Sequence, residues 1–446
     1  MDEVFSYLGL KPDIQITGEG ALPSNYAVTD LAVAAYGAVG VAIAELRAAQ
    51  GLAKTPEVQV NRVLASRWYG CSIHPVGWEL PPLWDAVAGL YQCKNGWIRL
   101  HTNLPHHRRV ALSVLNAAPT RKAVAQAAQS WRAEELETAI AQAGGVATMM
   151  RSAADWAAHP QGQAVAQEPL IDWVSPRHTA AKNWGATPAR PLNGLKVLDL
   201  TRVLAGPVAT RTLAGFGAQV LRIDPPDWEE PNVIPDVTLG KRCARLDLTL
   251  PKDRATFEAL LSDTDILVHG YRKGALSGLG YGLAARQKIR PDLIEASLNA
   301  YGWTGPWATR RGFDSLVQMA CGIADSGMRR AKAAEPTPLP VQALDHATGY
   351  LMAAAVIRVL TRAAQGGGVQ NARLSLARTA ALLMRHEQTE AGALAHAPVS
   401  ADYSPDIEPT PWGPAHRLKP ALHIEGCPMH WESAAVDLGS SPARWA

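Results

Sequence analysis

Cations, aromatic residues and glycines gather in short segments that follow strand-like runs of the sequence. The segments are Thr201–Pro207, Asp224–Pro226, His269–Gly274 and Asn299–Gly302, with Lys241 just ahead of another strand. Guanidinium and ammonium groups bind phosphate oxygens, and aromatic rings stack on a purine. Any one of these cations alone is best interpreted as part of a solvated loop. Their shared place at strand ends favours a site for a phosphate- and purine-containing ligand.

A bound dinucleotide is the first ligand to test against this pattern. The order strand, turn, helix, strand and Asp224 imitates the unit that holds an adenosine ribose in Rossmann proteins. The first turn, however, lacks the G-x-G-x-x-G pattern, and bulky Val203 and Leu204 stand where the backbone must approach a pyrophosphate. Nicotinamide or flavin chemistry is therefore the weaker interpretation.

The five cysteines are scattered and form no CxxC pair. Cys71 with His74, and Cys427 with His430, could each supply two ligands to a tetrahedral zinc. The two pairs lie far apart in irregular sequence, so we expect no metal site. Free thiols of this kind suit a reducing compartment.

The elements that must position these segments alternate between strands and helices. Predicted strands are 195–200, 219–223, 244–248, 265–269 and 292–298, and predicted helices are 207–215, 252–262 and 283–289. This alternation is typical of an α/β fold with a doubly wound parallel sheet, a Rossmann-like large domain whose ligand crevice opens at the carboxyl ends of the strands.

An internal repeat flanks this region. Asp30 and Asp345 each begin an apolar, Ala-rich segment that ends, at the same interval, in Arg-Ala-Ala-Gln-Gly and then continues through Val-Gln into a strand-like run. Asp as a cap and Gly as a terminator predict two long helices. Equal spacing and an identical five-residue ending favour an old duplication.

Changes in composition predict the domain boundaries. We expect an N-terminal partial repeat (1–82), a small α+β domain (83–175), a linker rich in Pro and Gly (176–191), the large domain (192–385) and an irregular C-terminal tail (386–446).

The 446 residues carry a net charge of only +3, and no apolar run reaches the roughly 20 residues that span a bilayer. We therefore expect neither nucleic acid nor membrane as a partner. The acidic start, Met1-Asp2-Glu3, is unlike a secretory signal, which predicts a cytoplasmic protein.

Seven segments in order resemble the class III coenzyme A transferases, the group that contains carnitine and formyl-CoA transferases and the α-methylacyl-CoA racemases. They are V-L-D-L-T-R-V-L-A-G-P, L-A-G-F-G-A-Q-V-L-R-I-D-P-P, G-K-R-C-A-R-L-D-L, D-I-L-V-H-G-Y-R-K-G-A-L-S-G-L-G, A-Y-G-W-T-G-P, G-F-D-S-L-V-Q and L-D-H-A-T-G-Y. The resemblance runs from about 191 to 380. The small domain precedes this half, so the order is permuted or one of two fused copies has been trimmed.

The resemblance implies an enzyme that moves coenzyme A between a donor acyl-CoA and an acceptor carboxylic acid, with no permanently bound cofactor. Asp345 would be the nucleophile, kept ionised by the positive end of its helix, with backbone N–H groups near to stabilise an oxyanion. The plain alternative for Asp345 is a helix cap, and Asp30 is expected to be a relic or a cap. The residues implied to bind coenzyme A are Arg202, Val203, Leu204, Lys241, Gly270, Tyr271, Arg272, Leu279 and Tyr301.

Departures from the family pattern bear on the substrate. Gly278 replaces a phosphate-binding arginine, Asn299 replaces a lysine and Leu204 replaces a glutamine of the formyl-CoA branch. Oxalate or formate is therefore doubtful, and Leu204 and Phe313 favour a larger or less charged acyl group.

Two other functions stay open. A racemase of the same family would need a histidine where this chain has Phe313, and a coenzyme-A-binding protein could have lost turnover. The family's interlocked homodimer is expected here, with the N-terminal half in place of a missing C-terminal domain.

Overall fold

The computed structural model describes residues 2–54, 56–180, 182–388, 394 and 398–446. Its centre is a seven-stranded sheet in the order β10-β9-β8-β11-β12-β13-β7. The strands are β7 (Asp172–Arg177), β8 (Lys196–Leu200), β9 (Gln219–Asp224), β10 (Lys241–Arg245), β11 (Ile266–His269), β12 (Ile294–Asn299) and β13 (Val369–Ser375). All neighbours are parallel except β7, which runs antiparallel to β13. The predicted doubly wound α/β fold is confirmed, with its strand order reversing between β8 and β11.

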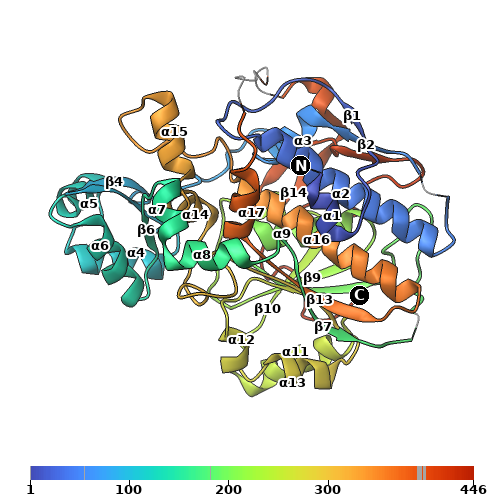
Figure 1. Cartoon of the computed structure of the whole chain (residues 1–446). Coiled ribbons are helices and arrows are strands. Elements are labelled where there is room, and N and C mark those ends of the chain that lie inside the picture. The colour runs from blue at the N-terminus through green and yellow to red at the C-terminus, as the bar shows by residue number, and fades with distance from the viewer. Residues whose placement is uncertain (1, 55, 181, 389–393, 395–397) are drawn as a thin grey trace.

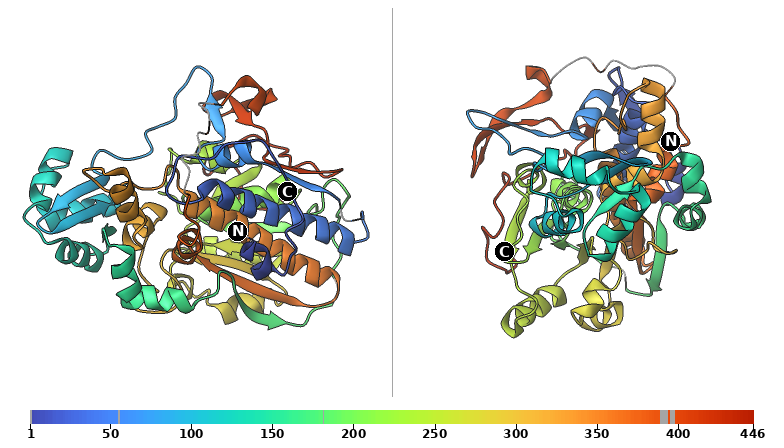
Figure 2. Two further views of the ribbon diagram at one scale, coloured as in Figure 1. Left: turned by 45° about the horizontal axis from the view of Figure 1, so that its top comes forward. Right: turned by 90° about the vertical axis from the view of Figure 1, so that its left-hand side faces the viewer.

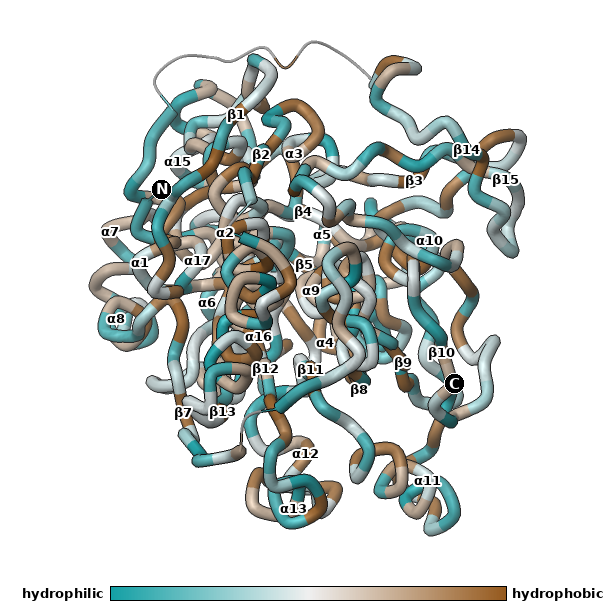
Figure 3. Tube along the Cα trace, turned by 90° about the vertical axis from the view of Figure 1, so that its right-hand side faces the viewer, coloured by the Kyte–Doolittle hydropathy of each residue, from teal (hydrophilic) through white to brown (hydrophobic). Residues whose placement is uncertain are grey.

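Helices cover both faces of this sheet (Figure 1). The helices of this half of the chain are α9 (Ala205–Gly215), α10 (Ile234–Val237), α11 (Pro251–Ser262), α12 (Ala275–Gly278), α13 (Leu283–Ile289), α14 (Asp314–Ala320), α15 (Ile323–Ala331), α16 (Ala343–Ala364) and α17 (Leu376–Leu383), of which α14 and α15 lie beside the small unit described below. Hydrophobic stretches run along β8 and β9 in the trace of Figure 3, because these strands are buried on both faces.

The two long apolar helices lie side by side (Figures 1 and 2). They are α2 (Val28–Ala49) and α16, and both are long and apolar enough to cross a membrane. In the fold, 89% and 94% of their apolar windows are buried. The hydroxyls of Tyr36 and Tyr350 are hydrogen-bonded where the helices touch. Both helices therefore form the centre of the protein core.

The N-terminal repeat reproduces a helix–strand–helix unit of the large domain. The remaining N-terminal elements are α1 (Glu3–Leu8), β1 (Gln15–Thr17), β2 (Val58–Asn61), α3 (Arg62–Trp68) and β3 (Ile73–Pro75). The sequence α2–β2–α3 matches α16–β13–α17, because each begins with a 22-residue helix. Asn61 and Ser375 then cap the third element by accepting the N–H three residues on. This correspondence supports the duplication.

A small unit stands apart at one end of the molecule (Figures 1 and 2). Its elements are β4 (Gly89–Cys93), β5 (Gly96–Leu100), α4 (Pro105–Leu115), α5 (Arg121–Ala128), α6 (Ala133–Gln142) and β6 (Ala147–Met149). They enclose their own hydrophobic core. The following helices, α7 (Ala153–Ala158) and α8 (Pro160–Gln167), contribute Trp156 and Val165 to the main core instead.

The end of the small unit and the start of one strand differ from the sequence predictions. The small unit ends near Met149 rather than at 175, since β7 completes the edge of the large sheet. Strand β10 begins at Lys241, three residues early, because its cation is buried against a carboxylate.

The tail is also more ordered than expected, outside residues 389–393 and 395–397, which are not described. It contains a 3₁₀ turn (Ser400–Asp402), β14 (Tyr403–Thr410), β15 (Gly413–Leu418) and β16 (Leu422–Ile424). Strand β15 pairs with β3, and β16 pairs with β2. The prolines of β14 are tolerated because β14 is an edge strand.

Candidate functional site

A cavity of about 370 Å³ opens where the small unit meets the carboxyl ends of β8 and β9. We call it the Asp345 cavity. Its walls come from the turn between β8 and α9, the 229–233 loop, the first residues of α16, and residues 81–86, which we call the strap. Val203, Leu204 and Asp345, three residues that the sequence assigned to one site, all line it.

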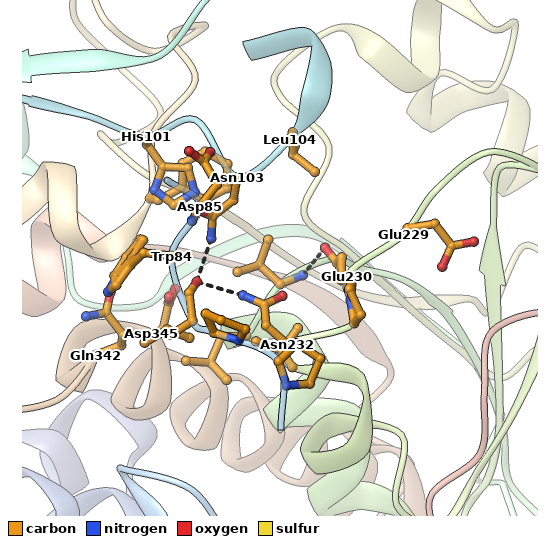
Figure 4. Close-up of a pocket in the computed structure, with 18 of the residues that line it drawn as sticks. Trp84, Asp85, His101, Asn103, Leu104, Glu229, Glu230, Asn232, Gln342 and Asp345 are labelled. Carbon is orange, nitrogen blue, oxygen red and sulfur yellow. Dashed lines mark hydrogen bonds between the residues drawn. The ribbon is translucent and has the colours of Figure 1, made fainter. Parts of the chain in front are cut away.

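The strap is fixed to both sides of the cavity through one carbonyl group. The Leu83 carbonyl accepts hydrogen bonds of 2.8 Å from the side-chain amides of Asn103, after β5, and Asn232, in the large domain (Figure 4). Asn103 also accepts the Asp85 N–H at 3.1 Å. This arrangement holds Trp84 over the cavity, between His101 and Gln342 in Figure 4.

Asp345 lies in the first turn of α16 and is only 7% exposed. A second buried carboxylate, Asp314 at the start of α14, organises this turn. Its Oδ2 accepts the N–H groups of Leu344 (2.8 Å) and Asp345 (2.9 Å), and its Oδ1 accepts the Gln318 amide at 2.5 Å. The first-turn N–H groups of α16 that the sequence analysis assigned to an oxyanion are therefore occupied by Asp314.

The pKa of Asp345 is shifted in the direction opposite to the one expected from the helix end. Burial and the neighbouring charge of Asp314 raise the pKa of Asp345 well above its ordinary value. Burial raises the pKa of Asp314 to about 6, although its hydrogen bonds oppose this shift. Burial and like charge thus act against the helix end, which was expected to favour the ionised form of Asp345.

The turn after β8 is held in an unusual backbone conformation. Val203 has a φ of 63°, which is costly for a β-branched residue. Its N–H donates to Glu230 Oε1 at 2.8 Å, and Glu230 is held in turn by Arg222 at 2.8 Å. Arg222 forms a bidentate pair with Asp224. This buried network orients the backbone beside Asp345.

Arg202 points away from the Asp345 cavity towards the end of β9. It pairs with Asp224 at 3.2 Å, and its guanidinium lies 5.3 Å from the Trp228 ring centre and 6.0 Å from that of Tyr271. Tyr271 and Arg272 line a second, smaller cavity of about 160 Å³ beyond β11. The contact between Arg202 and Tyr271 thus brings together the loops that follow β8 and β11.

The other predicted residues have different fates. Gly270 is exposed directly after β11, and Leu279, like Tyr271, is partly buried against a core cluster of the large domain. Asn299, the replacement noted above, exchanges two hydrogen bonds with the backbone of Gly302 and so stabilises its own loop.

Two predictions are wrong in this structure. Lys241 is buried, and its ammonium contacts Asp199 at 3.0 Å and the Pro207 carbonyl at 2.9 Å, so it cannot face a phosphate. Tyr301 is also buried, and its hydroxyl bonds to Thr148 at 2.9 Å, so its ring cannot frame an adenine. Burying a charge requires a partner, and Asp199 supplies it.

The small unit contributes a group that the sequence did not indicate. His101 follows β5, lines the Asp345 cavity and stacks on Phe313 with ring centres 3.8 Å apart. Burial lowers its pKa to about 3, so the imidazole is neutral. Phe313 marks the place of the missing racemase histidine, and only the fold shows that an imidazole lies against it.

Asp30 occupies the same helix position as Asp345, but it lines neither the Asp345 cavity nor the smaller one beyond β11. Its carboxylate pairs with Arg62 at 2.5 Å and is 46% exposed. Among the described residues, no cluster of three His, Cys, Asp or Glu side chains could hold a metal ion.

Comparison with known proteins assigns this half of the molecule. Residues 192–410 match the family model described as CoA-transferase family III. These residues, just under half of the chain, are therefore similar to CoA-transferase family III. The resemblance predicted from the seven sequence segments is thereby confirmed.

The relatives match only part of this chain, and this chain matches only part of each relative. It is 32% identical over 243 residues to the acetyl-coenzyme A transferase nodX of Hypoxylon pulicicidum, covering 51% of this chain and 41% of that protein. It is 34% identical over 147 residues to human succinyl-CoA:glutarate CoA-transferase, covering 30% and 34%. The chain thus spans about half or less of these relatives' length.

A solved structure of Rv3272 from Mycobacterium tuberculosis is 31% identical, covers 45% of this chain and 57% of that one, and has a TM-score of 0.42.

Proposed function

We propose that this chain is a coenzyme A transferase that uses Asp345 as its nucleophile. The observation that carries the proposal is the place of Asp345. It is a nearly buried carboxylate in the first turn of a core helix, and it faces a cavity at the carboxyl ends of a doubly wound sheet. A cap would not need a cavity of this size in front of it.

The proposed reaction proceeds through two kinds of covalent intermediate on Asp345. An oxygen of Asp345 attacks the thioester carbonyl of the donor, the C–S bond breaks, and coenzyme A leaves as a thiolate. The thiolate then attacks the Asp345 carbonyl of the resulting anhydride, which releases the donor acid and leaves an aspartyl-CoA thioester. An acceptor carboxylate reverses these steps, so that acyl-CoA and free Asp345 are regenerated. No net proton is consumed.

The surroundings of Asp345 suit this chemistry. Only the ionised carboxylate attacks, and the raised pKa makes that carboxylate a stronger nucleophile once it forms. Since Asp314 occupies the N–H groups of Leu344 and Asp345, the side chains of Gln342 and His101, which line the cavity, are proposed to donate to a developing oxyanion. Arg202, Tyr271 and Arg272 are proposed to hold the nucleotide end of coenzyme A.

The test is to trap the covalent intermediate. The full chain is incubated with an acyl-CoA and hydroxylamine, and its peptides are examined by mass spectrometry. A hydroxamate on Asp345 is expected, since only an anhydride or a thioester reacts in this way. Labelling of Asp30 instead, or acyl-CoA binding without any hydroxamate, would contradict the proposal, and the latter would favour a coenzyme-A-binding protein.

One observation favours a racemase as the second candidate. The imidazole of His101 stacks on Phe313 and lines the same cavity as Asp345, which would allow two proton-transfer groups. A pKa of about 3 makes His101 a weak base for an α-proton, so transfer is the better proposal. Exchange of the α-proton of a 2-methylacyl-CoA in D₂O would support the racemase.

We also propose a homodimer. In this structure the face of α16 beside Tyr350 is already covered by α2 of the same chain. A second chain would therefore have to dock elsewhere. Light scattering measures this directly, and a monomer at micromolar concentration that still transfers coenzyme A would refute it.

A further inference from the structure

A third cavity lies on the other side of the strap. It measures about 580 Å³ and reaches from the N-terminal repeat, at Tyr69, to His346 and Arg99. We call it the Arg99 cavity. It shares wall residues with the Asp345 cavity, among them Trp84, Leu204 and Gln342. The two cavities therefore adjoin each other along these shared residues.

Arg99 is the unusual residue of this cavity. It belongs to β5 and is only 9% exposed, and its side chain forms no hydrogen bond or ion pair within the part of the chain that the structure describes. Its guanidinium carbon lies 4.5 Å from the Trp84 ring centre, and its Nε is buried without a partner. Arg151 and Arg286 are comparably buried, yet each forms two hydrogen bonds to one glutamate.

A buried guanidinium without an anion is costly. Burial lowers the pKa of Arg99 to about 10, so the group stays charged at neutral pH. The carboxylate oxygens of the nearby Asp314 already accept hydrogen bonds from two backbone N–H groups and one side-chain amide. Asp236, the carboxylate that lines this cavity, is already paired with Arg211 (3.0 Å) and Arg417 (3.2 Å). Among the described residues, no carboxylate therefore pairs directly with Arg99, and Asp314 acts on it only at longer range.

We propose that Arg99 binds the second carboxylate of a dicarboxylic substrate whose first carboxyl group reacts at Asp345. Asp345 lines one cavity and Arg99 lines the next, so a monocarboxylate held by Arg99 would not present its carboxyl group to Asp345. A substrate with two carboxyl groups and a short methylene spacer satisfies both residues. Leu204, Leu339 and Val341 give the spacer an apolar path. This inference rests on the proposed transferase function.

The kinetic test compares substrates of matched length that differ only in the second carboxylate. The full chain is assayed with glutaryl-CoA and pentanoyl-CoA as donors, and with glutarate and pentanoate as acceptors. The donor and acceptor series show in which form the dicarboxylate is recognised. We expect Arg99→Gln to lower kcat/KM for the dicarboxylyl substrate by roughly ten- to hundredfold, and for the monocarboxylyl substrate by no more than about twofold.

Two further variants separate recognition from folding. Arg99→Lys keeps the charge and should retain part of the preference for the second carboxylate. Arg132→Gln is the control, because Arg132 is also a cation of the small unit but pairs with Glu134 at 2.6 Å on its surface. It should leave the preference unchanged. Equal loss for both substrates in Arg99→Gln, or no preference in the unaltered chain, would overturn the inference.

A binding measurement keeps this inference distinct from the transferase proposal. Titration calorimetry of the full chain with glutarate and with pentanoate requires no turnover. Saturable binding of glutarate that Arg99→Gln abolishes, in a chain that forms no hydroxamate, would support the carboxylate site and reject the transferase. Transfer of coenzyme A without selective binding of glutarate would support the transferase and reject the carboxylate site at Arg99.

Discussion

The two helix–strand–helix units contain the same aspartate in different surroundings. In α2–β2–α3 and in α16–β13–α17, the aspartate is the third residue of a 22-residue helix. Asp30 is partly exposed and pairs with Arg62, whereas Asp345 is buried and lies beside the carboxylate of Asp314. The elements alone therefore do not create the site.

The difference lies in what precedes and faces each helix. The large domain supplies α14, whose Asp314 binds the first-turn N–H groups of α16, and the turn after β8, which faces the cavity. The N-terminal copy lacks both, and Arg62 of its own α3 neutralises Asp30. A duplicated helix can retain its capping residue and its packing while it loses the partners that make a carboxylate reactive.

The largest expected effect is on turnover. Asp345→Asn should lower the rate of coenzyme A transfer by at least about a thousandfold, since the amide cannot form the anhydride. The matched variant Asp30→Asn should keep the rate within about twofold. Steady-state kinetics with circular dichroism as a folding control measure both. Comparable losses in the two variants would show that the N-terminal copy is also a working site.

A smaller effect is expected at Asp314. Asp314→Asn removes the charge that raises the pKa of Asp345, yet its amide oxygen can still accept the Leu344 and Asp345 N–H groups. The acid limb of the pH–rate profile should therefore move to lower pH, with a loss of roughly tenfold or less in the rate plateau. An unchanged profile would mean that Asp314 only anchors the helix.

Much of the large domain could be predicted from its sequence, because its signals are local. Strand and helix periodicity located most of the sheet, and the equal spacing of two aspartates identified Asp345 and its copy. The sequence misplaces the start of β10, because Lys241 looks like a cation of a loop. The partner that buries this cation, Asp199, is 42 residues away in sequence. Charge alone does not distinguish a phosphate ligand from half of a buried ion pair.

The small unit's part in the site could not be predicted. Trp84, Arg99 and His101 reach the cavities only because the unit docks beside α14 and α16, and no local pattern encodes that contact. The apolar Leu204 and Phe313 suggested a less charged acyl group, whereas the proposed role of Arg99 points to a second carboxylate.

A third prediction concerns stability. The folded-state pKa values of Asp345 and Asp314 lie above the ordinary 3.8, with Asp314 at about 6. Their contribution to stability is therefore complete below pH 3.8 and is lost as the pH rises through the folded-state values. The Asp345→Asn variant has no charge to bury at this position. At pH 7 its free energy of unfolding should therefore be roughly 1 to 3 kcal/mol higher than that of the unaltered chain.

Denaturant unfolding across pH checks this prediction. The advantage of Asp345→Asn should shrink as the pH falls towards 3.8, since both chains are then neutral at this position. If the variant is less stable at every pH, the carboxylate of Asp345 makes a favourable contact that outweighs the cost of burying its charge.

The smallest effect, of opposite sign, is expected for Asp30→Asn. The carboxylate of Asp30 is 46% exposed and Arg62 is 23% exposed, so solvent screens the pair, and its loss should cost less than about 1 kcal/mol. Arg62 stays anchored, because its Nε also donates to the Gly20 carbonyl at 2.7 Å. Unfolding in low and high salt separates the cause, since an exposed ion pair loses its contribution as salt is added. A large, salt-independent loss would mean that Asp30 supports the first turn of α2 as Asp314 supports that of α16, and the two copies would then differ less than their surroundings indicate.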